Sequence, residues 1–444
     1  MMFLPKMLSA DVLIDGVWYD VIGDNATVAF HGYIEVEYIN EDREWTTIQE
    51  ANYEGDIKIR SSVEIDGKEY PVTSISGNAF YNCRDLSSIT IPESVTSIGG
   101  SAFMNCSSLT SITIPEGVTN IGYYAFLGCT DLTTITIPES VTTIGFSAFS
   151  ACSGLTSVNI SDVASWCKIS FDNEGANPLS SAHHLFLNGV EVEDLVIPNS
   201  VTAIGSYAFS GCNAIKYLVI PNSITSIGGG AFSDCSSLTS ITIPGSVTSI
   251  GGSAFSGCSS LTSITILGSV TSIGSFAFMN CRGLTSITIP DGVTSIGEGA
   301  FSGCSGLTSI TIPSSVTVIG GDAFYGCNSL QDVTVLRCET PPLLYNLDYP
   351  VFPSNISQAI LYVPFGSKSA YSKSDEWGEF GQIIEIGTFS IDGINYKIAS
   401  EEQKTAMVIS AETSLSNVVI PSQVTYNGQT YTVNSIAQSA FEEN

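Results

Sequence analysis

Cysteine is the residue type of this chain that could do chemistry, because ten of the 12 cysteines recur at a fixed interval. They occupy positions 83, 106, 129 and 152, then 212, 235, 258, 281, 304 and 327, and neighbours within each series are 23 residues apart. Such thiols could form disulfides, bind a metal or fill a core. Stacked parallel chain segments would hold successive β-carbons about 4.8 Å apart, farther than the roughly 3.8 Å typical of a disulfide. We therefore expect a ladder of buried free thiols, with disulfides and a metal site as the alternatives.

Other chemistry-bearing residues are sparse. The three histidines are His31, which stands alone, and the adjacent His183 and His184, which would point to opposite faces of a strand. Paired carboxylates such as Glu401 and Glu402 fit a solvated turn. The chain has no Cys-x-x-Cys pair and no recognisable hydrolase, zinc-protease or nucleotide-binding motif. The sequence therefore predicts no enzyme, no cofactor and no metal site.

The cysteines belong to a longer repeat, LTSITIPxSVTSIGxxAFxxCxx, which must position them. The interval from Cys152 to Cys212 is 60 residues, which equals two periods plus 14, so one unit is long; we place this long rung at 155–191. The regular unit begins at Leu86, Leu109, Leu132, Leu155, Val192, Ile215, Leu238, Leu261, Leu284, Leu307 and Leu330. Neither a helical period nor strict alternation fits the whole unit, which favours one turn of a coil.

Within the unit, L-x-x-I-x-I predicts a short parallel strand that ends at the following proline. V-x-x-I-G predicts a second extended piece, and x-x-A-F-x-x-C predicts a short helical or 3₁₀ turn that only stacking could stabilise. One unit cannot bury its apolar side alone, so neighbouring units must share a continuous core.

The unit resembles the leucine-rich repeats of BspA-like bacterial surface proteins. The resemblance implies a right-handed leucine-rich-repeat solenoid of the α/β class, with short parallel strands, a 23-residue repeat and a β-rich N-terminal cap. We expect the cap at 1–62, the array at 63–335, a closing cap at 336–386 and a second cap module at 387–444. The segment "LYVPFGSKSAYSKSDEWGEFGQIIEI" resembles the closing cap of such arrays.

The second module rests on two echoes of the N-terminal sequence. "IDGINYKI" at 391–398 repeats "IDGVWYDV" at 14–21, and "NGQTYTVNSIAQSAF" repeats "DGKEYPVTSISGNAF". We therefore expect the last residues to be the start of a further array.

The resemblance also implies an extracellular or cell-surface protein that binds host or neighbouring-cell proteins, such as fibronectin or fibrinogen. A formal net charge of −29 argues against nucleic acid and anionic membrane as partners. No apolar run reaches the roughly 18 residues of a membrane span, and "MMFLPKMLSA" is too short for a complete signal peptide. The alternatives are a glycan-binding face of Thr and Ser on the outward strand positions, and an architectural spacer.

Contact residues are expected where the units differ from one another. Trp166 and Tyr217 lie in or near the long rung, together with His183, His184, Glu191, Glu193, Asp194 and Lys216. The two positions before Ala-Phe hold aromatic residues that we expect to be at least half exposed: Tyr123, Tyr124, Phe146, Tyr207 and Phe276. Such aromatics are frequent interface anchors, although edge-on packing between neighbouring units would also explain them.

Overall fold

A computed structural model describes residues 12–28, 53–337, 340–345, 350–364, 367–386, 388–400, 403–411, 418–426, 429–437 and 440. It divides into two compact units, Met1–Leu261 and Thr262–Asn444, and each is described by itself. The positions of His31, Cys338, Glu401 and Glu402 lie outside the described residues.

Unit 1 begins with a β-rich module. Its strands are β1 (Val12–Ile14), β2 (Val17–Ile22), β3 (Asn25–Val28), β5 (Ser62–Ile65) and β6 (Lys68–Ile75). β1, β2 and β3 form an antiparallel meander, and β3 then pairs in parallel with β6. β6 continues into the array because Ser74 and Ile75 pair with Ser97 and Ile98 of the first regular unit.

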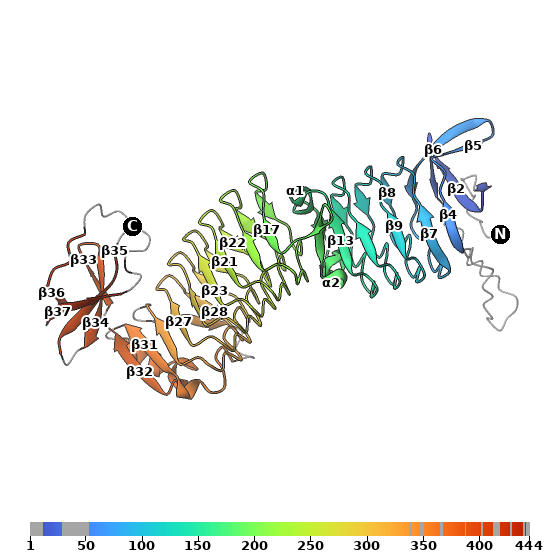
Figure 1. Cartoon of the computed structure of the whole chain (residues 1–444). Coiled ribbons are helices and arrows are strands. Elements are labelled where there is room, and N and C mark those ends of the chain that lie inside the picture. The colour runs from blue at the N-terminus through green and yellow to red at the C-terminus, as the bar shows by residue number, and fades with distance from the viewer. Residues whose placement is uncertain are drawn as a thin grey trace, which may run out of the picture. The chain divides into compact units, whose positions relative to one another are not determined.

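The first part of the array has two ladders of strands. The primary sheet contains the strands of the L-x-x-I-x-I segments, β7 (Leu86–Thr90), β9 (Ser111–Thr113), β11 (Thr134–Thr136) and β13 (Ser157–Ile160). β4 (Gly55–Lys58) pairs with β7 at one end of the sheet, and β15 (Leu185–Leu187) and the antiparallel β16 (Val190–Glu191) continue it at the other. The secondary sheet consists of two-residue strands at S-I-G, namely β8 (Ser97–Ile98), β10 (Asn120–Ile121), β12 (Thr143–Ile144) and β14 (Ser170–Phe171). Neighbouring strands of a sheet pair the equivalent positions of successive repeats, as Ile112 pairs with Ile135. The parallel-strand solenoid is confirmed (Figure 1).

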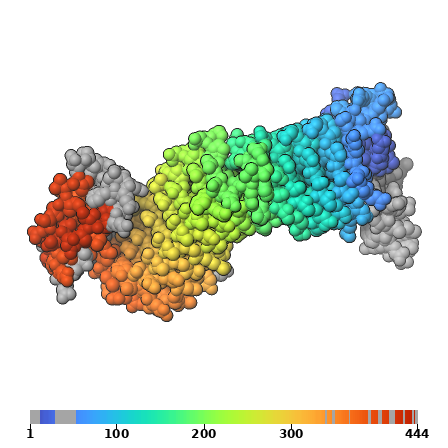
Figure 2. All heavy atoms as spheres, viewed as in Figure 1, coloured from blue at the N-terminus to red at the C-terminus, as the bar shows by residue number. Residues whose placement is uncertain are grey.

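The long rung lies between two sets of strands. It contains α1 (Val163–Trp166), the 3₁₀ helix η1 (Glu174–Ala176) and α2 (Leu179–Ala182). After it, new ladders start with β17 (Asp194–Val196), β19 (Tyr217–Val219) and β21 (Ser240–Ile243) in the primary sheet, and with β18 (Ala203–Ile204), β20 (Ser226–Ile227) and β22 (Ser249–Ile250) in the secondary one. Figure 1 shows α1 and α2 between β13 and β17. The rungs of this unit nevertheless form a continuous atomic surface on the face seen in Figure 2.

The A-F-x-x-C segment, predicted as a short helical or 3₁₀ turn, forms consecutive turns with hydrogen bonds between residues three positions apart. In the unit ending at Cys106, Ala102, Met104 and Cys106 each donate a backbone hydrogen bond to the residue three positions earlier. Positive φ angles of 56° at Ser101 and 61° at Asn105 prevent these turns from joining into a helix. Each turn also donates to the next rung, as in Phe103 N to Ala125 O at 2.7 Å.

The core repeats with the sequence. The phenylalanine of A-F stacks nearly parallel on its equivalent in the next rung, with centroids 5.1 Å apart for Phe80 and Phe103 and 5.3 Å apart for Phe209 and Phe232. These rings are fully buried, as are the leucines that begin the regular units. Because each rung buries the same side chains against its neighbours, the fold is stabilised by repetition of one packing unit.

Unit 2 continues the repeat and ends in two further segments. Its primary strands are β23 (Ser263–Ile266), β25 (Ser286–Thr288), β27 (Ser309–Ile312), β29 (Asp332–Val335), β31 (Ile360–Pro364) and β32 (Gln382–Ile386), and its secondary strands are β24 (Ser272–Ile273), β26 (Ser295–Ile296), β28 (Val318–Gly320) and β30 (Leu343–Tyr345). The closing segment adds η2 (Ile356–Gln358), α3 (Lys368–Ser372) and η3 (Trp377–Glu379). The phenylalanine stack of this unit ends at Phe352, whose ring meets that of Trp377 edge-on with the centroids 5.0 Å apart. The last module has β33 (Thr388–Ile391), β34 (Ile394–Ser400), β35 (Thr405–Ala411), β36 (Gln423–Tyr426) and β37 (Gln429–Ile436).

Candidate contact surfaces

The thiol ladder is structural. All cysteines of the described residues are free and buried. The thiol of Cys106 donates to the carbonyl of Phe80 at 3.0 Å, and the same bond recurs 26 residues apart at Cys129, Cys152, Cys235, Cys258, Cys304 and Cys327. Burial raises the pKa of the Cys152 and Cys212 thiols to about 12. Since the thiolate is the nucleophile and the metal ligand, these neutral thiols are unsuited to either role. The prediction of buried free thiols is confirmed.

One group of predicted contact residues forms an exposed aromatic cluster. Tyr123 is 58% exposed and Phe146 is 47% exposed. Tyr124 lies between them, with both rings edge-on to its own at centroid distances of 5.8 Å. The backbone of Tyr124 also donates to the carbonyl of Phe146 at 2.9 Å. Tyr124 is partly buried, so it supports the cluster and its predicted half exposure is wrong.

Tyr207 and Phe276 are also less exposed than predicted, and both are partly buried. Both have positive φ angles, 61° and 59°, which direct the rings along the stack. Each ring lies over a glycine of the following rung, Tyr207 over Gly230 and Phe276 over Gly299. A β-carbon on Gly230 would come within 2.7 Å of the Tyr207 ring. Packing against the next rung therefore explains why these two side chains are less exposed than predicted.

Trp166 is not a contact residue. Its side chain is 1% exposed, and its indole nitrogen donates to the carbonyl of Ala208 at 2.7 Å. In regular rungs the equivalent alanine carbonyl accepts from the phenylalanine amide of the preceding rung, as Ala125 does from Phe103. Trp166 supplies this donor from a side chain because the long rung lacks the regular turn. Its prediction as a partner contact is wrong for this reason.

The outward surface departs from its Ser and Thr pattern directly after the long rung. Val196 on β17 pairs with Val219 on β19, and both are more than half exposed. Tyr217 lies two residues before Val219 on the same face and is 58% exposed. Regular rungs carry Ser and Thr at these places, as in Ser111 and Thr113. We call Val196, Tyr217 and Val219 the junction patch.

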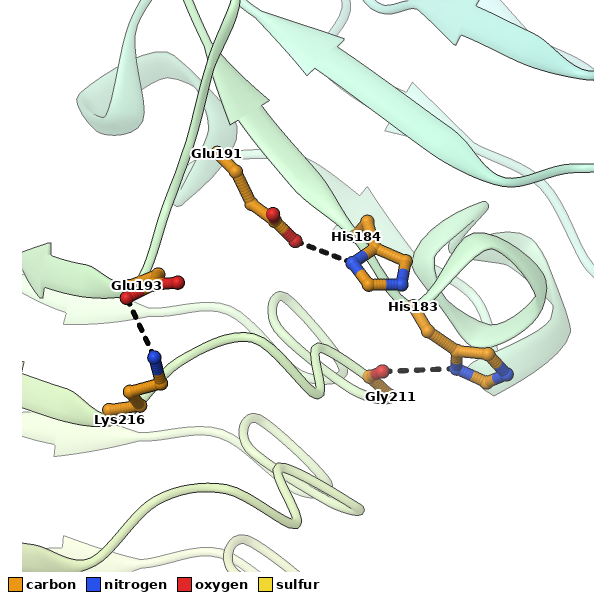
Figure 3. Close-up of polar contacts among 6 residues, drawn as sticks. All are labelled: His183, His184, Glu191, Glu193, Gly211 and Lys216. Atoms are coloured by element: carbon orange, nitrogen blue, oxygen red, sulfur yellow. Dashed lines mark hydrogen bonds and ion pairs between the residues drawn. The ribbon is translucent and has the colours of Figure 1, made fainter.

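Polar contacts join side chains of the long rung and of the two rungs that follow it (Figure 3). Lys216 forms an ion pair with Glu193 at 2.8 Å, and this hydrogen bond raises the pKa of the Lys216 ammonium. His184 Nδ1 is hydrogen-bonded to Glu191 Oε1 at 2.5 Å. His183 Nδ1 lies 3.1 Å from the carbonyl oxygen of Gly211 on the next rung. The two histidines therefore bind different partners, as expected of adjacent residues.

A cleft of about 430 Å³ opens where the secondary sheet is interrupted. Residues 167–171 form one wall, and residues from Ser200 to Ser206 form the other. The strands β14 and β18 do not pair, and the amide of Gly205 instead donates to the carbonyl of Cys167 at 3.3 Å. The lining contains hydroxyl groups and Lys168 but no carboxylate or histidine. Burial raises the pKa of Cys167 to about 12, so the lining holds no activated nucleophile or base.

The outward threonine column is exposed over most of its length. It consists of Thr90, Thr113, Thr136, Asn159, Val196, Val219, Thr242, Thr265, Thr288, Thr311 and Thr334, of which Asn159 and Thr334 are partly buried. Threonines next to the strands bind the preceding rung, as Thr133 Oγ1 does with Thr110 O at 3.3 Å. The two valines of the column were signals for the junction patch that the sequence prediction did not use.

No group of His, Cys, Asp and Glu in the part of the chain that the structure describes could hold a metal ion. None of the helices described there is long and apolar enough to cross a membrane.

Comparison with known proteins agrees with this geometry. The sequence matches the BspA type leucine-rich repeat region in six copies, over residues 46–176, 182–290 and 271–340. Among solved structures, the chain is similar to a leucine-rich cell surface protein from Faecalibacterium prausnitzii A2-165, with 28% identity, a TM-score of 0.45, and coverage of 73% of this chain and 94% of that one. It is also similar to the pneumococcal vaccine antigen PcpA, with 20% identity, a TM-score of 0.56, and coverage of 85% and 98%. The latter likeness supports the fold. No curated protein matches the sequence.

Proposed function

Since this chain belongs to the family of BspA-type leucine-rich repeat proteins, we propose that it is a non-enzymatic adhesin at the surface of a host-associated bacterium. In this role it contacts host matrix proteins or proteins of neighbouring cells. The family consists of bacterial surface repeat proteins, which supports the location. The neutral thiols and the lining of the cleft offer no reactive group, which supports a role in binding.

The junction patch is the observation that carries the proposal. Three apolar side chains lie side by side on two paired strands, and each is more than half exposed. Aromatic and aliphatic side chains bordered by charged groups are typical of the centres of protein interfaces. The ion pair of Lys216 and Glu193 and the carboxylate of Asp194 provide such a border. Apart from Asn159, the rest of the outward column carries threonine on each rung, which gives a partner no means to select one position.

Binding measurements with a set of matched variants test the proposal. The purified chain is immobilised and exposed to fibronectin, fibrinogen and other matrix proteins, and binding is followed by biolayer interferometry. The triple variant Val196→Thr, Tyr217→Ser and Val219→Thr restores the regular pattern on the junction patch. The matched variant Tyr123→Ser with Phe146→Ser removes the exposed part of the aromatic cluster.

We expect micromolar or tighter binding that the junction variant weakens at least tenfold and the cluster variant leaves within twofold. The reverse result would transfer the binding site to the aromatic cluster. Absence of binding to every protein of the panel would contradict the adhesin. A hit on a glycan array that is lost on Thr242→Lys would favour the glycan-binding face instead.

A further inference from the structure

The last module of the chain repeats the hydrogen bonding of the first one. In the first module β3 pairs in parallel with β6, with a register shift between Ala26 and Thr27. In the last module β35 pairs in parallel with β37, and the register shifts between Ala406 and Met407. The antiparallel hairpins correspond as well, since Val63 pairs with Tyr70 as Val424 pairs with Tyr431.

The turns that follow the paired strands are also equivalent. The amide of Ser76 donates to Val28 O at 2.9 Å, and the amide of Ala437 donates to Val408 O at 2.8 Å. Val72 and Val433 each donate to a serine carbonyl, Ser61 and Ser422, at 2.9 Å. Since the equivalent bonds hold the same backbone shape, Ile436 occupies the position of Ile75.

The two modules differ in what covers this isoleucine. Ile75 is 1% exposed, because β6 pairs on its other edge with β8. Ile436 is 53% exposed, and within the described residues the stretch 433–436 of β37 pairs with β35 alone. Val433 is likewise partly exposed, whereas its equivalent Val72 is fully buried. Among the residues that the structure describes, the edge that carries the array in the first module therefore has no partner strand in the last one.

The first module shows which groups a covering segment must have. Gly99 N donates to Ile75 O at 2.8 Å, and the hydroxyl of Ser94 donates to Val72 O at 2.6 Å. A β-carbon on Gly99 would overlap the backbone of Gly77, so glycine is required at that place. A segment that fits must therefore carry the S-V-T-S-I-G pattern of the regular unit, with its isoleucine on the isoleucine of the module.

We propose that the 433–436 edge of β37 is a docking site for a leucine-rich rung of the same 23-residue type, which enters in cis directly after the module. Its short strand pairs in parallel with Ser435 and Ile436, as β8 pairs with Ser74 and Ile75. The module is thus a second starter for a β-solenoid. This inference is independent of the proposed adhesin, because it concerns neither the junction patch nor a partner protein.

An extended chain tests the proposal. Residues 84–386 are appended after Asn444, because Asn444 occupies the position of Cys83 in the repeated sequence. Hydrogen–deuterium exchange of segment 429–437 is then compared between this extended chain and the 444-residue chain. We expect exchange at least tenfold slower in the extended chain. Ile436→Lys should abolish this protection, whereas Ile436→Val should preserve it. Thr425→Lys is the matched control and should leave the protection unchanged, because Thr425 is exposed on the hairpin of β36 and β37 and its equivalent in the first module, Glu64, is itself charged and exposed.

Three results would overturn the proposal. The first is unchanged exchange of 429–437 although circular dichroism and the exchange of the appended rungs show that they are folded. The second is failure of the appended array to fold, since the same rungs fold behind the first module. The third is protection of 429–437 in the unextended chain that rises with protein concentration, which would assign the edge to a second copy.

Discussion

The regular rungs and the long rung satisfy the same backbone groups in different ways. In a regular rung every ladder bond is made by an equivalent atom of the neighbour, as between Phe126 N and Ala148 O at 2.8 Å. Around the long rung, side chains replace these atoms. Ala208 O accepts from Trp166 and from Asn177, and the amides of Phe146 and Ser147 donate to the side chains of Asp172 and Asn173.

The two kinds of rung therefore differ in what stabilises them and in how far they can be told apart. Regular rungs depend on repeated apolar contacts, and any rung could replace another. The long rung depends on individual polar side chains that have no equivalent in the regular rungs that the structure describes. The exposed apolar residues of the junction patch follow the long rung directly. The interruption of the repeat therefore coincides with a surface that differs from that of the regular rungs.

The largest effect is expected for a change in a regular rung. Phe232→Ala removes a fully buried ring that stacks on Phe209 and Phe255, and large-to-small changes of this kind cost about 3–5 kcal/mol. Denaturant unfolding followed by circular dichroism should show this loss of unfolding free energy. Phe146→Ala is the control, because its ring is 47% exposed and its loss should cost less than about 1 kcal/mol. Equal losses for both would contradict the role assigned to the phenylalanine stack.

A smaller loss is expected at the long rung. Asn177 is fully buried, and its amide group donates to Tyr207 O at 2.6 Å and to Ala208 O at 3.1 Å. Asn177→Ala should cost about 2 kcal/mol, because it leaves buried carbonyl and amide groups without these partners. Hydrogen exchange should accelerate around Leu179, whose amide donates to the Asn177 side chain, and remain unchanged at the rung of Phe126. A uniform increase over all rungs would mean that the long rung is not a separate structural element.

The sequence predicted the regular rungs well because every apolar position recurs, so periodicity identified the buried leucine, phenylalanine and cysteine together. The sequence could not predict which carbonyl each thiol donates to, because that depends on the rise between neighbouring rungs. Trp166 was mispredicted because a residue inside an insertion has no repeat to fix its direction. The exposure of Tyr207 was mispredicted because the glycine beneath its ring, Gly230, lies in the next rung.

The thiol ladder gives a prediction for alkaline pH. The pKa of the Cys152 thiol is raised to about 12 in the folded chain, above the roughly 8.5 of an unfolded cysteine. Its stabilising contribution is therefore fully present below about pH 8.5 and is lost as the pH rises towards 12. We expect Cys152→Ala to reduce the fall in unfolding free energy between pH 8 and pH 10 by about 1–2 kcal/mol. An unchanged pH slope, or rapid reaction of the native thiols with Ellman's reagent at pH 8, would contradict the buried ladder.

The smallest effect on stability is expected at the junction patch. Tyr217→Ser replaces a side chain that is 58% exposed with the residue that regular rungs carry there, so the free energy of unfolding should change by less than about 0.5 kcal/mol. The same change should cost more than tenfold in affinity for a matrix protein that the intact chain binds, because an exposed aromatic anchor contributes mainly after a partner has excluded water from it. Thermal unfolding and biolayer interferometry on one preparation give both values. Ser240→Ala, at the equivalent position of the next rung, is the control and should change neither. A loss of affinity that came with an equal loss of stability would show that Tyr217 holds the fold, and the regular and interrupted parts of unit 1 would then no longer differ in function.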